Sequence, residues 1–141
     1  MAAPSAAPIR SHYLLDRISP EGYIVTMAIE VICTDDFESW WNDLSESEQD
    51  SVARYVRLLE ERGVTLPFPY SSEIVGSRFA LRELRVQSGG KPLRVFYAFD
   101  PERQAVLLVG GDKTGRDRFY EEMIPRAERI WKEYLNEIEQ Q

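Results

Sequence analysis

The most regular pattern along the chain is a pair of segments in which polar and apolar residues alternate. Residues 81–87 and 93–99 both alternate, and Gly89 and Gly90 lie between them. Glycine readily adopts the positive φ angles of a tight turn, so this pattern predicts a β-hairpin. The implied register gives the hairpin one apolar face: Leu84 faces Val95, Val86 faces Leu93 and Ala80 faces Phe99, with Arg82 and Tyr97 at the rim.

The opposite face of the predicted hairpin is polar, and it sets Arg85 directly opposite Arg94. Like charges in facing positions destabilise a sheet by roughly 0.5 kcal/mol. Glu83, which faces Phe96, lies diagonal to Arg94 and can offset part of that repulsion. This face is therefore either a solvated surface with one ion pair or an anion site, in which two guanidinium groups on a rigid sheet bind a phosphate.

Apolar spacing predicts a strand and two helices before the hairpin. Residues 28–33 form a short apolar strand, and a helix then begins at Thr34 or Asp35. Ser45 to Glu48 matches a capping box that begins a second helix, and Gly63 ends that helix. The positions expected to be buried are Phe37, Trp40, Trp41 and Leu44 on the first helix, and Val52, Tyr55, Val56 and Leu59 on the second.

The remaining segments predict a third antiparallel strand and a last helix. Residues 65–72 contain two prolines and are expected to form an extended loop. After the hairpin, a turn at residues 100–103 leads to a strand at residues 105–110. Residues 119–138 are amphipathic, with Pro125 as a kink or as the first residue of the main helix. The whole pattern predicts a small α+β domain.

The composition limits the class of protein. The chain has 141 residues, of which 43% are hydrophobic, and this suits one globular domain with one core. Cys33 is the single cysteine, so an intramolecular disulfide is excluded, and no stretch is apolar enough to span a membrane. We therefore expect a protein of the reducing cytoplasm.

The first 26 residues differ from the rest of the chain. They are rich in proline and small residues and lack a sustained period, whereas Met27 heads the strand and helix pattern. We expect residues 1–26 to be a flexible N-terminal extension, with Met27 as the true start and residues 27–141 as the domain. The alternative is that the extension adds a strand or covers an edge of the sheet.

The charge is unevenly distributed along the chain. The net charge is −7, and residues 28–62 hold ten acidic residues against three basic ones. Residues 78–118 hold nine basic residues against five acidic ones. Because local charge governs binding within a Debye length of about 8–10 Å, a polyanion can dock on the predicted sheet despite the acidic total.

Several kinds of catalytic site are excluded by the residues available. The only histidine, His12, lies in the first 26 residues, so we expect no Ser-His-Asp triad, no Cys-His pair and no ordinary zinc site. Residues 110–115 read GGDKTG, but Asp112 stands where a phosphate-binding loop requires glycine before the lysine. Lys113 belongs to a functional cluster only if it shares the face of the two arginines.

At this point the order of elements and three stretches resemble the RelE/HigB-like toxins of bacterial type II toxin–antitoxin systems, particularly the phage-derived HigB-like branch. The stretches are Glu-Leu-Arg at residues 83–85, Arg-Val-Phe-Tyr at residues 94–97, and Lys113 at the end of the next strand. The resemblance covers about residues 28–138. It implies a curved antiparallel sheet packed against two N-terminal helices, with a C-terminal helix. It also implies an endoribonuclease that cleaves messenger RNA on the ribosome and inhibits translation, without a metal or another cofactor.

The resemblance also implies roles for individual residues. Arg85 and Arg94 would hold and stabilise the scissile phosphate, Lys113 would add charge or transfer a proton, and Glu83 would be a general base or a tether for an arginine. Tyr97 is a weaker candidate because its position in the alternation is on the core side. Further cations are expected to contact RNA: Arg78, Arg82, Lys91, Arg116 and Arg118.

The expected partners are messenger RNA on the ribosome and a cognate antitoxin of helix-turn-helix type, which would form an oligomeric complex with the toxin; no membrane partner is expected. Two alternatives stay open. Some members of the superfamily bind DNA gyrase and cut nothing, and an inactive relative would only bind its antitoxin.

Overall fold

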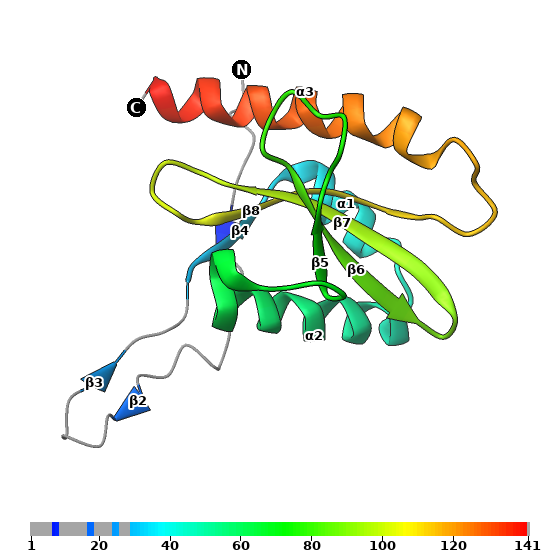
Figure 1. Cartoon of the computed structure of the whole chain (residues 1–141), viewed down its shortest axis with the longest axis horizontal. Coiled ribbons are helices and arrows are strands. Elements are labelled where there is room, and N and C mark those ends of the chain that lie inside the picture. The colour runs from blue at the N-terminus through cyan, green and yellow to red at the C-terminus, as the bar shows by residue number, and fades with distance from the viewer. Residues whose placement is uncertain (1–6, 9–16, 19–23, 26–28, 141) are drawn as a thin grey trace.

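The fold is a central sheet with helices on both faces (Figure 1). The computed structural model describes residues 7–8, 17–18, 24–25 and 29–140. Helices α1 (Asp35–Asn42) and α2 (Glu46–Arg62) cover one face, and α3 (Phe119–Glu139) covers the other. The predicted α+β class, with two helices before the hairpin and one at the C-terminal end, is confirmed.

The sheet has the order β1-β4-β8-β7-β6-β5. Its antiparallel part contains β5 (Ser71–Glu73), β6 (Arg82–Ser88), β7 (Lys91–Phe99) and β8 (Ala105–Asp112). The first core strand, β4 (Val31–Cys33), is parallel to β8, so the sheet is mixed. Between these two parallel neighbours the chain passes through α1, α2 and the strands β5, β6 and β7.

Two short features lie outside this plan. β1 (Ala7–Pro8) pairs antiparallel with β4, and β2 (Arg17–Ile18) pairs with β3 (Ile24–Val25) in a separate ladder. Most of the expected extension, and Met27 with it, lies outside the described residues. The predicted boundary between extension and domain therefore stays a prediction.

The hairpin has the predicted register. Leu84 pairs with Val95, Val86 with Leu93, and Arg85 with Arg94. Gly89 and Gly90 have φ angles of 56° and 82°, the two positive values that the turn requires. The ladder begins at Arg82 and Tyr97, so the expected pairing of Ala80 with Phe99 is wrong; Phe99 instead pairs with Ala105 of β8.

The predicted helix boundaries are confirmed by their caps. Thr34 is the N-cap of α1, and its hydroxyl accepts from the amide of Phe37. Ser45 and Glu48 form the capping box of α2, and Gly63 is its C-cap. A 3₁₀ turn, η1 (Gly63–Thr65), follows. Pro125 lies inside α3, so it does not begin the helix.

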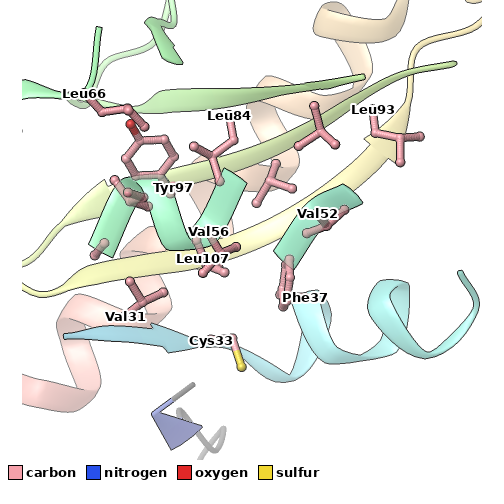
Figure 2. Close-up of a cluster of buried hydrophobic side chains, with 14 residues drawn as sticks. Val31, Cys33, Phe37, Val52, Val56, Leu66, Leu84, Leu93, Tyr97 and Leu107 are labelled. Carbon is pink, nitrogen blue, oxygen red and sulfur yellow. The ribbon is translucent and has the colours of Figure 1, made fainter. Parts of the chain in front are cut away.

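The first hydrophobic core lies between the sheet and α1–α2. Figure 2 shows Leu84, Leu93 and Tyr97 of the sheet on the same side as Val52 and Val56 of α2. Tyr97 is fully buried, not at a rim, because α2 and Leu66 close over that end of the sheet.

The second core lies between α3 and the other face of the sheet. It joins apolar side chains of β7 and β8, among them Phe96 and Val109, to Phe119, Met123 and Trp131 of α3. A register shift in β8 turns two successive residues, Leu108 and Val109, towards this core. The polar face of the hairpin is therefore not a simple solvated surface, because α3 covers part of it.

Gly110 and Gly111 allow helices to approach β8 from both sides. A Cβ atom at Gly110 would lie 2.3 Å from the Trp40 ring, and one at Gly111 would lie 2.9 Å from the Phe119 ring. Real Cβ atoms do not approach so closely. Gly110 and Gly111, the first two glycines of the GGDKTG stretch, thus serve helix packing, which agrees with the failure of that stretch to match a phosphate loop.

This packing gives a first prediction, the substitution Gly110→Ala. The added methyl group clashes with the indole of Trp40, and overpacking of this kind costs about 1–3 kcal/mol of unfolding free energy. Chemical denaturation measures the loss. In a Trp40→Leu background the same substitution should cost markedly less, and an equal cost in both backgrounds would show that the indole is not the cause.

Candidate functional site

Glu83 is the centre of a polar cluster on the α3 side of the hairpin. Its carboxylate is buried, and it accepts hydrogen bonds from the hydroxyl groups of Ser72 at 2.9 Å and Tyr120 at 2.8 Å. One oxygen lies 3.4 Å from Nη1 of Arg85, and the other lies 3.6 Å from Nε of Arg94. The single carboxylate therefore bridges the two facing arginines, and this bridge offsets the repulsion that their register creates.

Arg94 is the buried cation of the cluster. Its side chain is only 5% exposed, and Nη1 donates to the carbonyl of Leu93 at 3.1 Å. Its Nε makes no hydrogen bond within the described part of the chain, because the 3.6 Å separation from Glu83 is too long for one. Gly111 lies beside Arg94 on β8. A buried N–H without an acceptor lowers the stability of a fold, and here the carboxylate of Glu83 offsets the charge of the group.

Arg85 is the more accessible of the two arginines. Its side chain is 29% exposed, and its guanidinium lies over the ring of Phe68, 5.1 Å from the centroid. The carboxylate of Glu83 on one side and this ring on the other fix the orientation of the guanidinium. The guanidinium of Arg85 is therefore held in one orientation and is partly exposed to solvent.

Tyr120, in the first turn of α3, joins Lys113 to the cluster. Its hydroxyl donates to Glu83, and the Nζ of Lys113 lies 5.3 Å from the centre of its ring. Burial, followed by the hydrogen bond to Glu83, raises the pKa of Tyr120, while Arg94 partly offsets that shift. Tyr120 is therefore a protonated donor at neutral pH. Lys113 shares the face of the arginines, as its candidate role requires.

The comparisons with known proteins come at this point. A family model described as phage derived protein Gp49-like (DUF891) matches residues 39–132. This range includes the charged and phenolic residues of the cluster: Glu83, Arg85, Arg94, Lys113 and Tyr120. This chain belongs to the Gp49-like family. No solved structure matches the chain.

Two relatives of this Gp49-like chain are Mycobacterium tuberculosis proteins named as candidate toxins. HigB2 is 36% identical over 104 residues, which are 72% of this chain and 52% of that protein. HigB3 is 38% identical over 107 residues, which are 74% of this chain and 92% of that protein. The chain thus spans about half the length of HigB2 and nearly all of HigB3. The expected resemblance to HigB-like toxins is confirmed.

The other five cations predicted to bind RNA have other partners in this Gp49-like protein. Arg82 projects to the opposite face, where its Nε donates to Ser71 at 3.2 Å. The remaining four are each paired with a carboxylate of a helix: Arg78 with Glu128, Lys91 with Glu48, Arg116 with Glu122 and Arg118 with Glu121. The structure therefore brings together the four predicted catalytic residues but none of the five predicted RNA contacts.

Sequence reasoning missed three members of the site. Tyr120 was assigned only to the amphipathic pattern, and Ser72 and Phe68 fell in the segment expected to be a loop. Ser72 lies in β5 opposite Glu83. The period-2 pattern of a three-residue strand is too short to recognise. One signal could have identified Tyr120. It follows Phe119, which lies on the apolar face of the helix, so its side chain lies at the border of that face and close to the sheet.

The described residues contain no group of three or more His, Cys, Asp or Glu that could hold a metal ion. Among the same residues, no helix is both long and apolar enough to cross a bilayer. The cluster of this Gp49-like protein itself offers three cations, one bridging carboxylate and one phenol.

The bridge gives a second prediction, the substitution Glu83→Gln. Removing one partner of a buried ion pair leaves an uncompensated charge at Arg94, so the free energy of unfolding should fall by about 3 kcal/mol. The matched control is Glu121→Gln, which breaks an exposed pair with Arg118 and should cost less than about 0.5 kcal/mol. Similar losses in the two variants would contradict a bridging role for Glu83.

The raised pKa of Tyr120 gives a third prediction, which concerns alkaline stability. The phenol has a pKa of roughly 10 in the unfolded chain and a higher pKa in the folded protein. The protonated phenol therefore stabilises the fold fully below pH 10, and this stabilisation is lost as the pH rises through the pKa of the folded protein. Unfolding free energies measured between pH 8 and 11 should fall less steeply above pH 10 in Tyr120→Phe than in the wild type. Parallel curves would exclude the linkage.

Proposed function

We propose that this chain is the toxin of a type II toxin–antitoxin system and acts as a metal-independent endoribonuclease on messenger RNA at the ribosome. The observation that carries the proposal is the convergence of Arg85, Arg94 and Lys113 around Glu83 on one rigid sheet face. Three cations against one carboxylate leave a net positive site. Its similarity to HigB2 and HigB3 supports the toxin role.

The proposed reaction is an internal transfer at phosphorus. The 2′-hydroxyl of one nucleotide loses its proton to solvent water and attacks the adjacent phosphorus, while the bond from phosphorus to the 5′-oxygen of the next nucleotide breaks. The products are a cyclic 2′,3′-phosphate and a 5′-hydroxyl, which takes up a proton. Such a reaction needs alignment, cationic stabilisation of the charge that develops on the phosphoryl oxygens, and a proton donor for the leaving oxygen.

The geometry favours a particular division of these roles. Arg85 is accessible and presents its fork to the phosphate, whereas Arg94 lies behind it and contributes charge at short range in a poorly solvated position. Lys113 lies over Tyr120 and forms no ion pair with a carboxylate of the described residues, so it is suited to donate a proton or add charge. Tyr120 is a further candidate donor.

Glu83 is better suited to be a tether than a general base. Its two oxygens already accept from two hydroxyl groups and contact both arginines, and its side chain is nearly inaccessible. A general base must reach the 2′-hydroxyl directly or through one water. We therefore assign to Glu83 the orientation of Arg85 and Arg94.

We also propose a cytoplasmic setting and a cognate antitoxin of helix-turn-helix type that covers the site. A net positive cluster that is partly open to solvent is a suitable target for an acidic segment of such a partner. Assembly into a toxin–antitoxin oligomer is part of the same proposal. It draws on the similarity to the HigB proteins and not on a contact seen in this chain.

The experiment that tests the function is induction of the full chain in bacteria, with mapping of new 5′ ends in messenger RNA. The wild type should arrest growth and create cuts within translated frames. Arg85→Ala should lower cutting by about a hundredfold, since removing one donor from a developing anion costs about that much. Arg129→Ala, which alters an exposed cation paired with Glu133, is the matched control and should cut as the wild type does.

Each other outcome has a distinct meaning. Growth arrest with intact messages would exclude the nuclease and favour a gyrase-binding toxin. Normal growth with folded protein would favour an inactive relative. Equal cutting by the wild type and Arg85→Ala would remove the arginine pair from the mechanism while leaving the nuclease in place.

A further inference from the structure

Phe68 is a large aromatic side chain that the fold leaves open to solvent. Phe68 belongs to the segment between η1 and β5, and the guanidinium of Arg85 lies over its ring. The residue is 69% exposed. Three other large apolar residues of the described chain are also exposed: Val64, Tyr70 and Val75. Two of these are aliphatic, and Tyr70 packs against Tyr55. Among these four described residues, Phe68 is the one whose ring lies against a guanidinium of the site.

The backbone around Phe68 is tied to the strand that carries Arg85. The amides of Tyr70 and Ser71 both donate to the carbonyl of Pro67, at 3.0 and 3.1 Å, and this closes the segment into a turn. The amide of Arg85 donates to the carbonyl of Tyr70 at 2.8 Å. The ring is therefore held at a fixed place relative to the guanidinium, which lies 5.1 Å from its centroid.

An exposed ring in this position suits a nucleobase. One part of Phe68 contacts a planar cation, and most of its remaining surface stays in water, which is unfavourable for an apolar group. A base that stacks on this open surface would remove it from water. The phosphate of the same nucleotide or its neighbour would then lie within reach of Arg85. Proteins that bind single-stranded RNA commonly pair aromatic platforms with cationic grooves in this way.

We propose that Phe68 is a stacking platform for an unpaired base next to the scissile phosphate. This inference rests on the proposed function, because it assumes that the cluster binds RNA. It names the ligand as an unstacked nucleotide of single-stranded RNA, recognised by its flat face and not by its hydrogen-bonding edge. Phe68 thus adds substrate affinity beside the catalytic cations and is tolerant of base identity, since every base has such a face.

The test uses purified full-length protein in a translating extract with a reporter message, and cuts are measured by primer extension. Phe68→Ala and Phe68→Leu should raise the toxin concentration for half-maximal cutting about tenfold, the effect expected for the loss of one stacked base. Phe68→Trp should restore it, because tryptophan offers a larger aromatic face. Val75→Ala, at another exposed apolar residue, should behave as the wild type. Thermal unfolding confirms that each variant is folded.

The outcomes separate this inference from the proposed function. If the wild type does not cut, both are overturned. If the wild type cuts and Phe68→Ala cuts at the same concentration, the platform is overturned, the nuclease stands, and Phe68 is left as a contact for a protein partner. If Phe68→Leu reaches half-maximal cutting at the same concentration as Phe68→Trp, the ring merely supports Arg85 and does not stack a base. The same conclusion follows if the variants lower only the rate of cutting at saturating toxin.

Discussion

The carboxylate of Glu83 is the interaction on which the site depends. Without it, the register of the hairpin would place two guanidinium groups against each other on a face that α3 partly removes from water. Coulomb repulsion grows as water is excluded, so a pair that is tolerable on an open sheet is costly here. Glu83 contacts one arginine through each oxygen, and Ser72 and Tyr120 satisfy its remaining acceptor capacity. The cluster is then a connected network whose members fix one another.

This network links the site to the packing of α3. Tyr120 reaches Glu83 because Phe119, its neighbour, packs beside Gly111, and a side chain at that glycine would push the first turn of the helix away from the sheet. On the opposite face, Gly110 accepts Trp40 in the same manner. Gly110 and Gly111, which resemble part of a phosphate loop in sequence, thus act by letting helices pack close to the sheet. They hold α3 where its phenol completes the polar cluster.

Local pattern was sufficient to predict the hairpin, its register and the helix caps. Each of these depends on residues a few positions apart: the Gly89-Gly90 turn fixes the facing pairs, and the Ser45 capping box is complete within one turn. What could not be predicted depends on contacts between distant segments. The β5 strand has only three residues and exists because β6 pairs with it. Burial of Tyr97 and the role of Tyr120 follow from how α2 and α3 close over the sheet, which no local spacing encodes.

The charge distribution shows why a count along the sequence overstated the basic surface. Strand alternation sends Arg82 to the opposite face from Glu83, and helix carboxylates pair with Arg78, Lys91, Arg116 and Arg118. Each such carboxylate offsets part of the positive charge that its cation would otherwise add to the surface. The predicted catalytic cations Arg85, Arg94 and Lys113, in contrast, lie together on one face of the sheet. Their charge is opposed there by the single carboxylate of Glu83, so this small group, and not the total charge of residues 78–118, makes that face of the sheet positive.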